Sequence, residues 1–153
     1  MTDAPQGRWL ATPLGPVSLR AAGGRLVALD WRAAEGTPDP LEAEALAQIA
    51  AYFAGRLQVF DLPLDWGQGL QERVRRAMAA IPFGETRSYG QIAAVVGAPA
   101  QAVGQACGAN PLPILIPCHR VLGGRGLGGF SAPGGVESKV ALLRHEGAAG
   151  LLI

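Results

Sequence analysis

The chain of 153 residues contains little cysteine and little histidine, with two of each. Cys107 and Cys118 are too few for a disulfide framework, and their spacing is not that of a zinc site. A four-ligand metal site would also need carboxylates, and no suitable cluster stands out in the sequence. We therefore expect no metal site. Because free thiols survive in a reducing compartment, the expected location is the cytoplasm.

Long hydrophobic runs and an excess of charge are also missing. No apolar run approaches the roughly 18 residues that a membrane span needs, and the N-terminus lacks a signal-peptide pattern. We therefore expect no membrane association. The formal net charge is +1, so any binding to nucleic acid would depend on a local basic patch. Hydrophobic residues make up 49% of the chain, enough for the core of one domain or of two small lobes.

The first part of the chain has the pattern of strands followed by a helix. Residues 8–31 show the alternation typical of antiparallel strands, around a turn that contains two glycines. Apolar residues recur at helical spacing over residues 41–56. Pro63 argues against a central strand in residues 58–66, so this segment is expected to be an edge strand or a connector.

The second part predicts a series of helices, at residues 70–81, 89–97, 100–110 and 136–147. The first is amphipathic, and three arginines are expected elsewhere on its surface: Arg73, Arg75 and Arg76. Ser88 and Gly97 are the expected caps of the second. The second and third helices flank a tight turn and resemble a helix-turn-helix, although such hairpins also occur in proteins that do not bind DNA.

The segment "NPLPILIPCHRVLG", residues 110–123, ends an apolar run with Cys118 and His119. A thiol becomes a strong nucleophile when a base or a positive charge favours the thiolate. Glu146 in the last helix is a candidate for the acid that would orient the imidazole. The residue types alone leave a second interpretation open, in which Cys118 is a small buried hydrophobe and His119 a core histidine.

The string "IPCHRV" resembles the active-site signature of the O6-alkylguanine-DNA alkyltransferases, also called methylated-DNA–protein-cysteine methyltransferases. Further strings resemble that family in the same order along nearly the whole chain: "TPLGPVSL", "YFAGRLQVFDLPLD", "VRRAMAAIPFGETRSYGQIAAVVG", "AVGQACGANPLPILIPCHRVLG", and "GFS" followed by "LLRHEG". The resemblance implies an α/β (α+β) fold. A strand-rich, ribonuclease H-like lobe would span residues 1–67, and a helical lobe with a helix-turn-helix of the winged-helix type would span residues 68–153.

The resemblance also implies roles for individual residues. Cys118 corresponds to the cysteine that accepts the alkyl group, and His119 to the histidine that deprotonates it through a water molecule. Glu146 corresponds to the acid that completes this relay. Asn110 corresponds to the asparagine that braces the helix turn and the active-site strand, and the resemblance implies that the segment before Cys118 is this strand.

Further residues correspond to positions that contact DNA or the lesion, with Tyr89 expected to press on the phosphate 3′ of the lesion and Ser131 to help read the extruded guanine. The full expected set is Tyr89, Gln101, Ala102, Gly104, Arg120, Phe130 and Ser131. The chain departs from the family at Gln101, where an arginine usually takes the place of the extruded nucleotide. The preceding turn, "GAPA", is also about two residues shorter than the family pattern.

The expected partner is double-stranded DNA that contains O6-alkylguanine, bound by a monomer through the helix-turn-helix in the minor groove. The expected reaction extrudes the base and transfers its alkyl group irreversibly to Cys118 in a single turnover. O4-alkylthymine is a second expected substrate. No cofactor is expected, because the damaged DNA is itself the alkyl donor.

Two other functions compete with this one. The substitution at Gln101 keeps open a non-catalytic, alkyltransferase-like protein that binds the lesion, although such proteins lack the cysteine. A cysteine hydrolase would also use a cysteine, a histidine and an acid, but no oxyanion-hole signature accompanies them.

Overall fold

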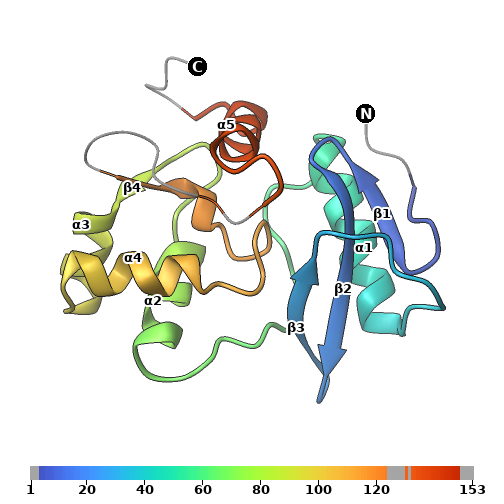
Figure 1. The fold of residues 1–153 in the computed structure, drawn as a ribbon, viewed down its shortest axis with the longest axis horizontal. Helices are drawn as coiled ribbons and strands as arrows, with labels where there is room; N and C mark the ends of the chain where they lie inside the picture. The colour runs from blue at the N-terminus through green and yellow to red at the C-terminus, as the bar shows by residue number, and fades with distance from the viewer. Residues whose placement is uncertain (1–3, 124–129, 131, 149–153) are drawn as a thin grey trace. The chain divides into compact units, whose positions relative to one another are not determined.

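The structure is a computed structural model that describes residues 4–123, 130 and 132–148. The chain forms two compact units, Met1–Asp65 and Trp66–Ile153. Strands begin the first unit, and helices make up most of the second (Figure 1). Among the described residues, no helix is both long enough and apolar enough to cross a membrane.

The first unit contains an antiparallel sheet in the order β1 (Trp9–Thr12), β2 (Gly15–Ala22) and β3 (Arg25–Asp30). Gly23 and Gly24 connect β2 to β3 with φ angles of 60° and 76°. A two-residue hairpin turn with both φ angles positive matches the twist of the strands, and glycine adopts it without a steric penalty. The predicted strands and turn are therefore confirmed.

Helix α1 (Pro40–Phe53) packs on this sheet and contacts all three strands. The four fully buried side chains on its inner side recur at helical spacing: Ala45, Leu46, Ile49 and Tyr52. Asp39 caps the helix in a reciprocal capping box with Glu42, which stabilises its first turn. The predicted helix is confirmed, with its end at Phe53 rather than at residue 56.

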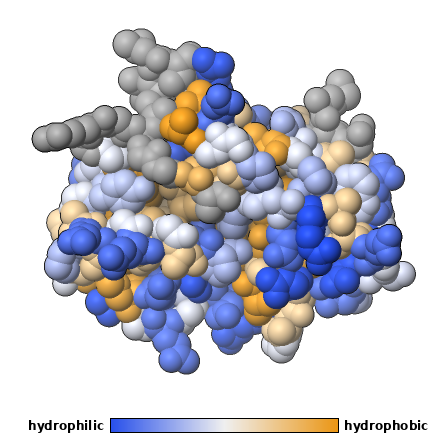
Figure 2. Space-filling view, in the orientation of Figure 1, coloured by the Kyte–Doolittle hydropathy of each residue, from blue (hydrophilic) through white to orange (hydrophobic). Residues whose placement is uncertain are grey.

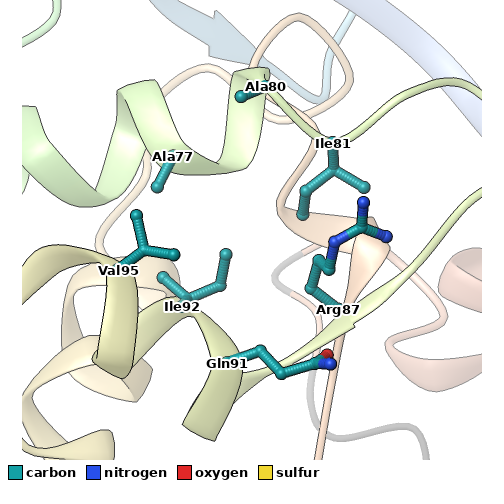
Figure 3. Close-up of a pocket in the computed structure, with 7 residues that line it drawn as sticks. All are labelled: Ala77, Ala80, Ile81, Arg87, Gln91, Ile92 and Val95. Atoms are coloured by element: carbon teal, nitrogen blue, oxygen red, sulfur yellow. The ribbon is translucent and has the colours of Figure 1, made fainter.

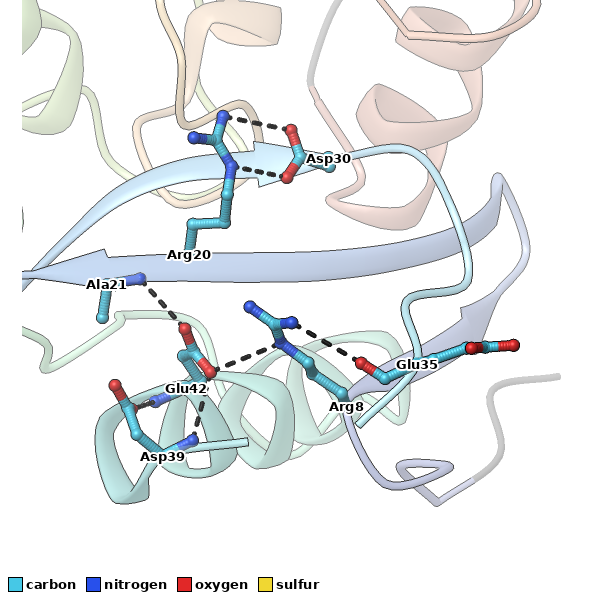
Figure 4. A network of polar contacts seen from close by, with 7 residues as sticks. All are labelled: Arg8, Arg20, Ala21, Asp30, Glu35, Asp39 and Glu42. Atoms are coloured by element: carbon cyan, nitrogen blue, oxygen red, sulfur yellow. Dashed lines mark hydrogen bonds and ion pairs between the residues drawn. The ribbon is translucent and has the colours of Figure 1, made fainter. Parts of the chain in front are cut away.

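Glu42 also ties α1 to the sheet (Figure 4). Its side chain is 8% exposed, and it accepts hydrogen bonds from the backbone amides of Ala21 and Asp39, both at 3.1 Å. Arg8 lies 3.8 Å from the same carboxylate. Ala21 stands where the β2–β3 register shifts, so Glu42 satisfies an amide at an irregular point of the sheet.

The segment that leaves α1 behaves as the predicted connector. Leu64 forms an isolated parallel bridge with Leu26. Leu26 donates its amide to the Pro63 carbonyl at 2.9 Å, and Asp65 donates to the Leu26 carbonyl at 2.9 Å. Pro63 has no amide proton to donate, which is compatible with this short contact at the edge of the sheet.

The second unit contains five helical segments and one short parallel pair of strands among its described residues. In chain order these are α2 (Gly69–Ala79), β4 (Arg87–Ser88), α3 (Tyr89–Val96), α4 (Ala100–Gly108), η1 (Cys118–Arg120), β5 (Val121–Leu122) and α5 (Val136–His145). The predicted helices are confirmed. The second ends at its expected cap, Gly97, and the other three end two residues earlier than predicted. Helix ends fray, so bounds commonly differ by one or two residues.

Helices α3 and α4 form the predicted hairpin and pack against α2. Ser88 caps α3 through a capping box with Gln91. Gly97 ends α3 in the left-handed conformation, with φ at 71°, a position that glycine occupies without strain. Pro99 then precedes α4 in an extended conformation. These local signals fix where α3 ends and where α4 begins.

The surface position predicted for Arg75 is wrong. Arg75 is 8% exposed, and it donates a hydrogen bond to Gln71 at 3.3 Å. Gly67 makes room for it, since a Cβ atom at that glycine would lie 2.7 Å from the guanidinium Nη1. The apolar stem of an arginine can be buried where its head group finds space and partners.

The segment before the cysteine is not the expected strand. Its residues form turns and then the 3-10 helix η1. Pro111, Pro113 and Pro117 supply no amide protons, which prevents a regular ladder of hydrogen bonds. The segment is nevertheless buried, as its apolar composition predicts, with Ile114 and Ile116 at 1% and 0% exposure.

Large hydrophobic residues at the surface stand apart from one another in the described sequence: Val59, Val95 and Val136. On the face drawn in Figure 2, hydrophobic and hydrophilic residues are interspersed.

Candidate active site

Cys118 stands at the start of η1 and is 9% exposed. Both cysteines are free thiols. The turn segment before Cys118 is braced by Asn110, whose amide donates to the Ile116 carbonyl at 3.0 Å and accepts from the Leu112 amide at 3.1 Å. Within this segment Ile114 has a φ of 73°, a strained conformation for a β-branched residue. A strained backbone persists only where its surroundings hold it, and Asn110 supplies two of those contacts.

The environment of Cys118 combines burial with groups that favour the thiolate. The pKa of the Cys118 thiol is raised above its ordinary value, because burial outweighs the Asn110 side chain, the Lys139 ammonium and a backbone hydrogen bond, which lower it. A thiol in such a site is protected from water and still has partners for its charged form.

His119 is joined directly to Glu146. The imidazole Nε2 lies 2.7 Å from a Glu146 carboxylate oxygen, and the two side chains are 1% and 0% exposed. A hydrogen bond to a carboxylate places the proton on Nε2. The second ring nitrogen, Nδ1, is buried and has no hydrogen-bond partner among the residues that the structure describes. A neutral imidazole in this tautomer presents Nδ1 as a proton acceptor.

The pKa of His119 is lowered from its ordinary value. Burial is the largest cause, and the charges of Arg120 and Lys139 act in the same direction. The hydrogen bond and the charge of Glu146 oppose this effect without overcoming it. His119 is therefore neutral near pH 7, the state in which it can accept a proton.

Glu146 occupies the C-cap position of α5. A carboxylate is unfavourable there, because the C-terminal end of a helix carries a partial negative charge. Arg120 compensates for it: Nε donates to one carboxylate oxygen at 2.8 Å and Nη2 donates to the other at 2.9 Å. The buried carboxylate of Glu146 is thus stabilised by a side chain from outside α5.

The geometry does not support the expected contact of Arg120 with DNA or the lesion. Its side chain is 7% exposed. Two of its nitrogens bind Glu146, and the third, Nη1, donates to the Ile81 carbonyl at 2.7 Å. An arginine that packs against a buried carboxylate has no free edge for a phosphate or a base, so its role lies inside the protein.

Lys139 was missed by the sequence interpretation. It is the only lysine in the chain, it is fully buried in α5, and its ammonium donates to the Val121 carbonyl at 2.7 Å. Burial lowers the pKa of Lys139, and the charges of Cys118 and Cys107 raise it. Two signals could have found it: its uniqueness, and its helical spacing from Leu142 and Glu146, which places it on the buried side.

Tyr89 and Cys107 belong to the same neighbourhood. Tyr89 opens α3 and is partly buried. Its pKa is raised, first by burial and then by the charges of Cys107 and Cys118. Cys107 lies in α4, contacts the Met78 sulfur at 3.5 Å, and has its pKa raised to about 12, mainly by burial. Cys118 differs from Cys107 in having the Asn110 side chain as a hydrogen-bond partner that lowers its pKa.

The remaining predicted contact residues are placed as follows. In α4, Gln101 is exposed, while Ala102 and Gly104 are partly buried. The Phe130 ring meets the His119 ring edge-on, with centroids 6.4 Å apart. Ser131 lies outside the described residues.

A hollow of about 320 Å³ lies elsewhere in this unit, between α2 and α3 (Figure 3). Ala77, Ile92 and Val95 give it an apolar lining, and Arg87 stands at its edge. Cys118, His119 and Glu146 are absent from its lining. Within the described ranges, no group of three or more histidine, cysteine or acidic side chains is placed to hold a metal ion.

The second unit thus combines a helix-turn-helix hairpin with a buried cysteine, histidine and glutamate. This combination defines the class of the protein as a helix-turn-helix protein with a candidate thiol nucleophile. Residues 69–148 match the model of the family described as 6-O-methylguanine DNA methyltransferase, DNA binding domain. The chain belongs to the methylated-DNA–protein-cysteine methyltransferase family.

Individual relatives agree with this assignment. The chain is 45% identical to the methylated-DNA–protein-cysteine methyltransferase of Mycobacterium tuberculosis over 91% of this chain and 90% of that protein. It is 42% identical to the constitutive enzyme of Bacillus subtilis over 73% of this chain and 77% of that protein. The crystal structure of Mycobacterium tuberculosis OGT in complex with DNA matches with a TM-score of 0.79 and 44% identity, covering 92% and 91% of the two chains.

These comparisons confirm the mixed α/β fold class. The finer descriptions of the two lobes, ribonuclease H-like and winged-helix, stay predictions.

Proposed function

We propose that this protein repairs DNA by transferring an alkyl group from O6-alkylguanine to its own Cys118. One observation carries the proposal: His119 donates Nε2–H to buried Glu146, and this leaves Nδ1 as an acceptor on the residue that follows the buried Cys118 in the chain. Family membership supports the same chemistry, since the matched relatives are named for methyl transfer from DNA to cysteine.

The reaction begins with the thiol proton. It passes from Cys118 through a water molecule to Nδ1 of His119, and Glu146 stabilises the imidazolium that forms. The thiolate then attacks the alkyl carbon in line with the carbon–oxygen bond. A carbon–sulfur bond forms, the carbon–oxygen bond breaks, and guanine leaves with the electron pair. Guanine takes up one proton, and the imidazolium of His119 returns the thiol proton to water, so the exchange balances. Because the thioether product is stable, each molecule reacts once.

The substrate has to reach the thiol as an extruded base, because the reacting atoms lie inside the duplex stack. The α3–α4 hairpin is the proposed DNA-binding element, and the solved relative in complex with DNA supports DNA as the partner. Binding of a monomer in the minor groove is part of the proposal, with Tyr89 pressing on the phosphate 3′ of the lesion. Gln101, Ala102 and Gly104 belong to the exposed or partly exposed side of α4.

The alternative of a non-catalytic lesion-binding protein is disfavoured by the presence of Cys118 and by the buried hydrogen bond between His119 and Glu146. A cysteine hydrolase would need a preorganised oxyanion hole, and nothing in the sequence indicates one.

Mass spectrometry tests the proposal. The protein is incubated with duplex DNA that contains O6-methylguanine, and a mass gain of one methyl group is expected on Cys118. No lysine or arginine separates Cys107 from Cys118, so trypsin leaves both in the peptide 88–120. Fragment ions must therefore locate the methyl group.

Two variants complete this experiment. Cys118→Ala should lose transfer and retain DNA binding, whereas Cys107→Ala should retain both. A methylated Cys118→Ala protein would refute the assignment, and a wild-type protein that never gains mass would refute the activity. Duplexes with O4-methylthymine extend the test to the second expected substrate.

A further inference from the structure

Arg120 connects three parts of the second unit through its guanidinium. Nε and Nη2 donate to the two oxygens of Glu146 at 2.8 and 2.9 Å. Nη1 donates at 2.7 Å to the carbonyl of Ile81, just beyond the end of α2. The planar, rigid fork of an arginine fixes the plane of a carboxylate that it binds at both oxygens, which a lysine cannot do.

The orientation of Glu146 matters because one of its oxygens is shared. Oε2 accepts from Arg120 Nη2 and also from His119 Nε2, at 2.9 and 2.7 Å. The direction of the carboxylate therefore determines the direction of the imidazole. A ring anchored through Nε2 presents Nδ1 on the opposite edge, and Nδ1 is the buried nitrogen without a partner in the described part of the chain.

The charge on Arg120 matters as well. The charges that act on His119 are those of Arg120 from η1 and of Lys139 and Glu146 from α5, and the titratable Cys118 precedes it in η1. Glu146 alone would favour an imidazolium, which has no acceptor nitrogen left. Arg120 neutralises that carboxylate, and its charge opposes protonation of the ring.

We propose that Arg120 is a positioning residue for alkyl transfer. Its two hydrogen bonds to Glu146 keep His119 neutral and protonated on Nε2. Nδ1 is then available to accept the proton of Cys118. The effect of Arg120 on the transfer rate rests on the proposed function. Its effect on the protonation state of His119 is independent of that function.

A purely structural role for Arg120 makes a different prediction. Removing a buried cation from a paired carboxylate destabilises a fold whatever the site does. It would lower the melting temperature without changing the titration of His119 in the protein that remains folded. The protonation state of the imidazole therefore separates the two roles.

The test is ¹⁵N NMR of the histidine rings as a function of pH, in wild type, Arg120→Met and Arg120→Lys. The chain has two histidines, so His145 serves as an internal reference. Wild type should show His119 neutral and protonated on Nε2 near pH 7. In Arg120→Met the titration midpoint of His119 should rise by about one to three pH units, the range typical of a neighbouring charge.

The transfer rate should follow the titration. The acid limb of the rate against pH should move to higher pH in Arg120→Met by the same interval, because protonated His119 cannot accept the thiol proton. Arg120→Lys retains the charge, so its midpoint should stay near that of wild type. Its rate should still fall severalfold, because an ammonium cannot grip both oxygens.

Arg20→Met is the matched control. Arg20 binds Asp30 through Nε and Nη2 at 2.8 and 3.4 Å, an arginine–carboxylate pair of the same kind at an exposed position of the first unit. This variant should leave the titration of His119 and the transfer rate unchanged.

A folded Arg120→Met protein in which His119 keeps the tautomer and midpoint of wild type would overturn the proposal. If Arg120→Met does not fold, Arg120→Lys decides alone, and a wild-type transfer rate in that variant overturns it. A wild-type protein that transfers no alkyl group would refute the proposed function, while the NMR result would still report on Arg120.

Discussion

Glu42 and Glu146 are both almost fully buried, at 6% and 4% exposure, yet they are held in different ways. Glu42, in the first unit, accepts hydrogen bonds from two backbone amides (Figure 4). Glu146, in the second unit, is held by the side chains of Arg120 and His119. Backbone amides do not titrate, whereas an imidazole does.

The difference shows how a buried carboxylate acquires a role. A carboxylate bound by backbone amides is a fixed part of the scaffold, because its partners have a single protonation state. A carboxylate bound by an imidazole shares a proton with it, so the pair can take part in proton transfer. Burial alone does not distinguish the two roles, and the identity of the partner does.

The largest expected effect is on the rate of the variant Glu146→Gln. Without the carboxylate, the imidazolium of His119 loses its stabilising charge, so transfer at neutral pH should slow by a factor of about ten to a hundred. Single-turnover rates with O6-methylguanine duplexes measure this. A folded Glu146→Gln protein that reacts at the wild-type rate would mean that another group orients His119.

Glu42→Gln should produce the opposite pattern. An amide side chain can accept only one of the two backbone hydrogen bonds, so the free energy of unfolding should fall by about 1–3 kcal/mol. Denaturant unfolding measures the loss, and the transfer rate of the folded protein should equal that of wild type. A slowed reaction would remove the distinction between the two glutamates.

Lys139→Met examines whether a buried charge in the second unit acts on the thiol. The ammonium lowers the pKa of Cys118, so its removal raises that pKa. Because the reactive thiolate predominates only above the pKa, the rise of rate with pH should move to higher pH, and transfer at pH 7 should fall about tenfold for each pH unit by which that pKa rises. Rates from pH 6 to 9 provide the measurement. An unchanged profile in a folded variant would assign Lys139 to packing alone.

The smallest effect is expected at Gln101, an exposed residue that belongs to the surroundings of neither Glu42 nor Glu146. Extruding a base costs a few kcal/mol, and a side chain that fills the gap offsets part of this cost. Arginine stacks better than glutamine and carries a charge. Gln101→Arg should therefore speed repair of O6-methylguanine in duplex DNA severalfold, and reaction with the free base O6-benzylguanine should change little. Equal acceleration of both reactions, or of neither, would show that Gln101 does not enter the base stack.

Local patterns in the sequence determined the order of the elements, because capping residues, turn glycines and apolar spacing act over a few residues. Ser88 and Gly97 bound α3 as predicted, and the "PCHR" string identified the candidate nucleophile. The prediction of a strand before Cys118 was wrong, because three prolines in that segment remove amide protons that the hydrogen bonds of a strand need.

Only the tertiary structure decided which charges meet in the second unit. Arg120 and Glu146 are separated by 26 residues, and periodicity carries no information about partners at that distance. The same holds for Arg75, whose burial depends on the space left by Gly67, and for Lys139, whose ammonium reaches Val121 on another element. A buried charge needs a partner wherever packing places one, so the sequence determined which groups are present, and the packing of η1, α2 and α5 decided their roles.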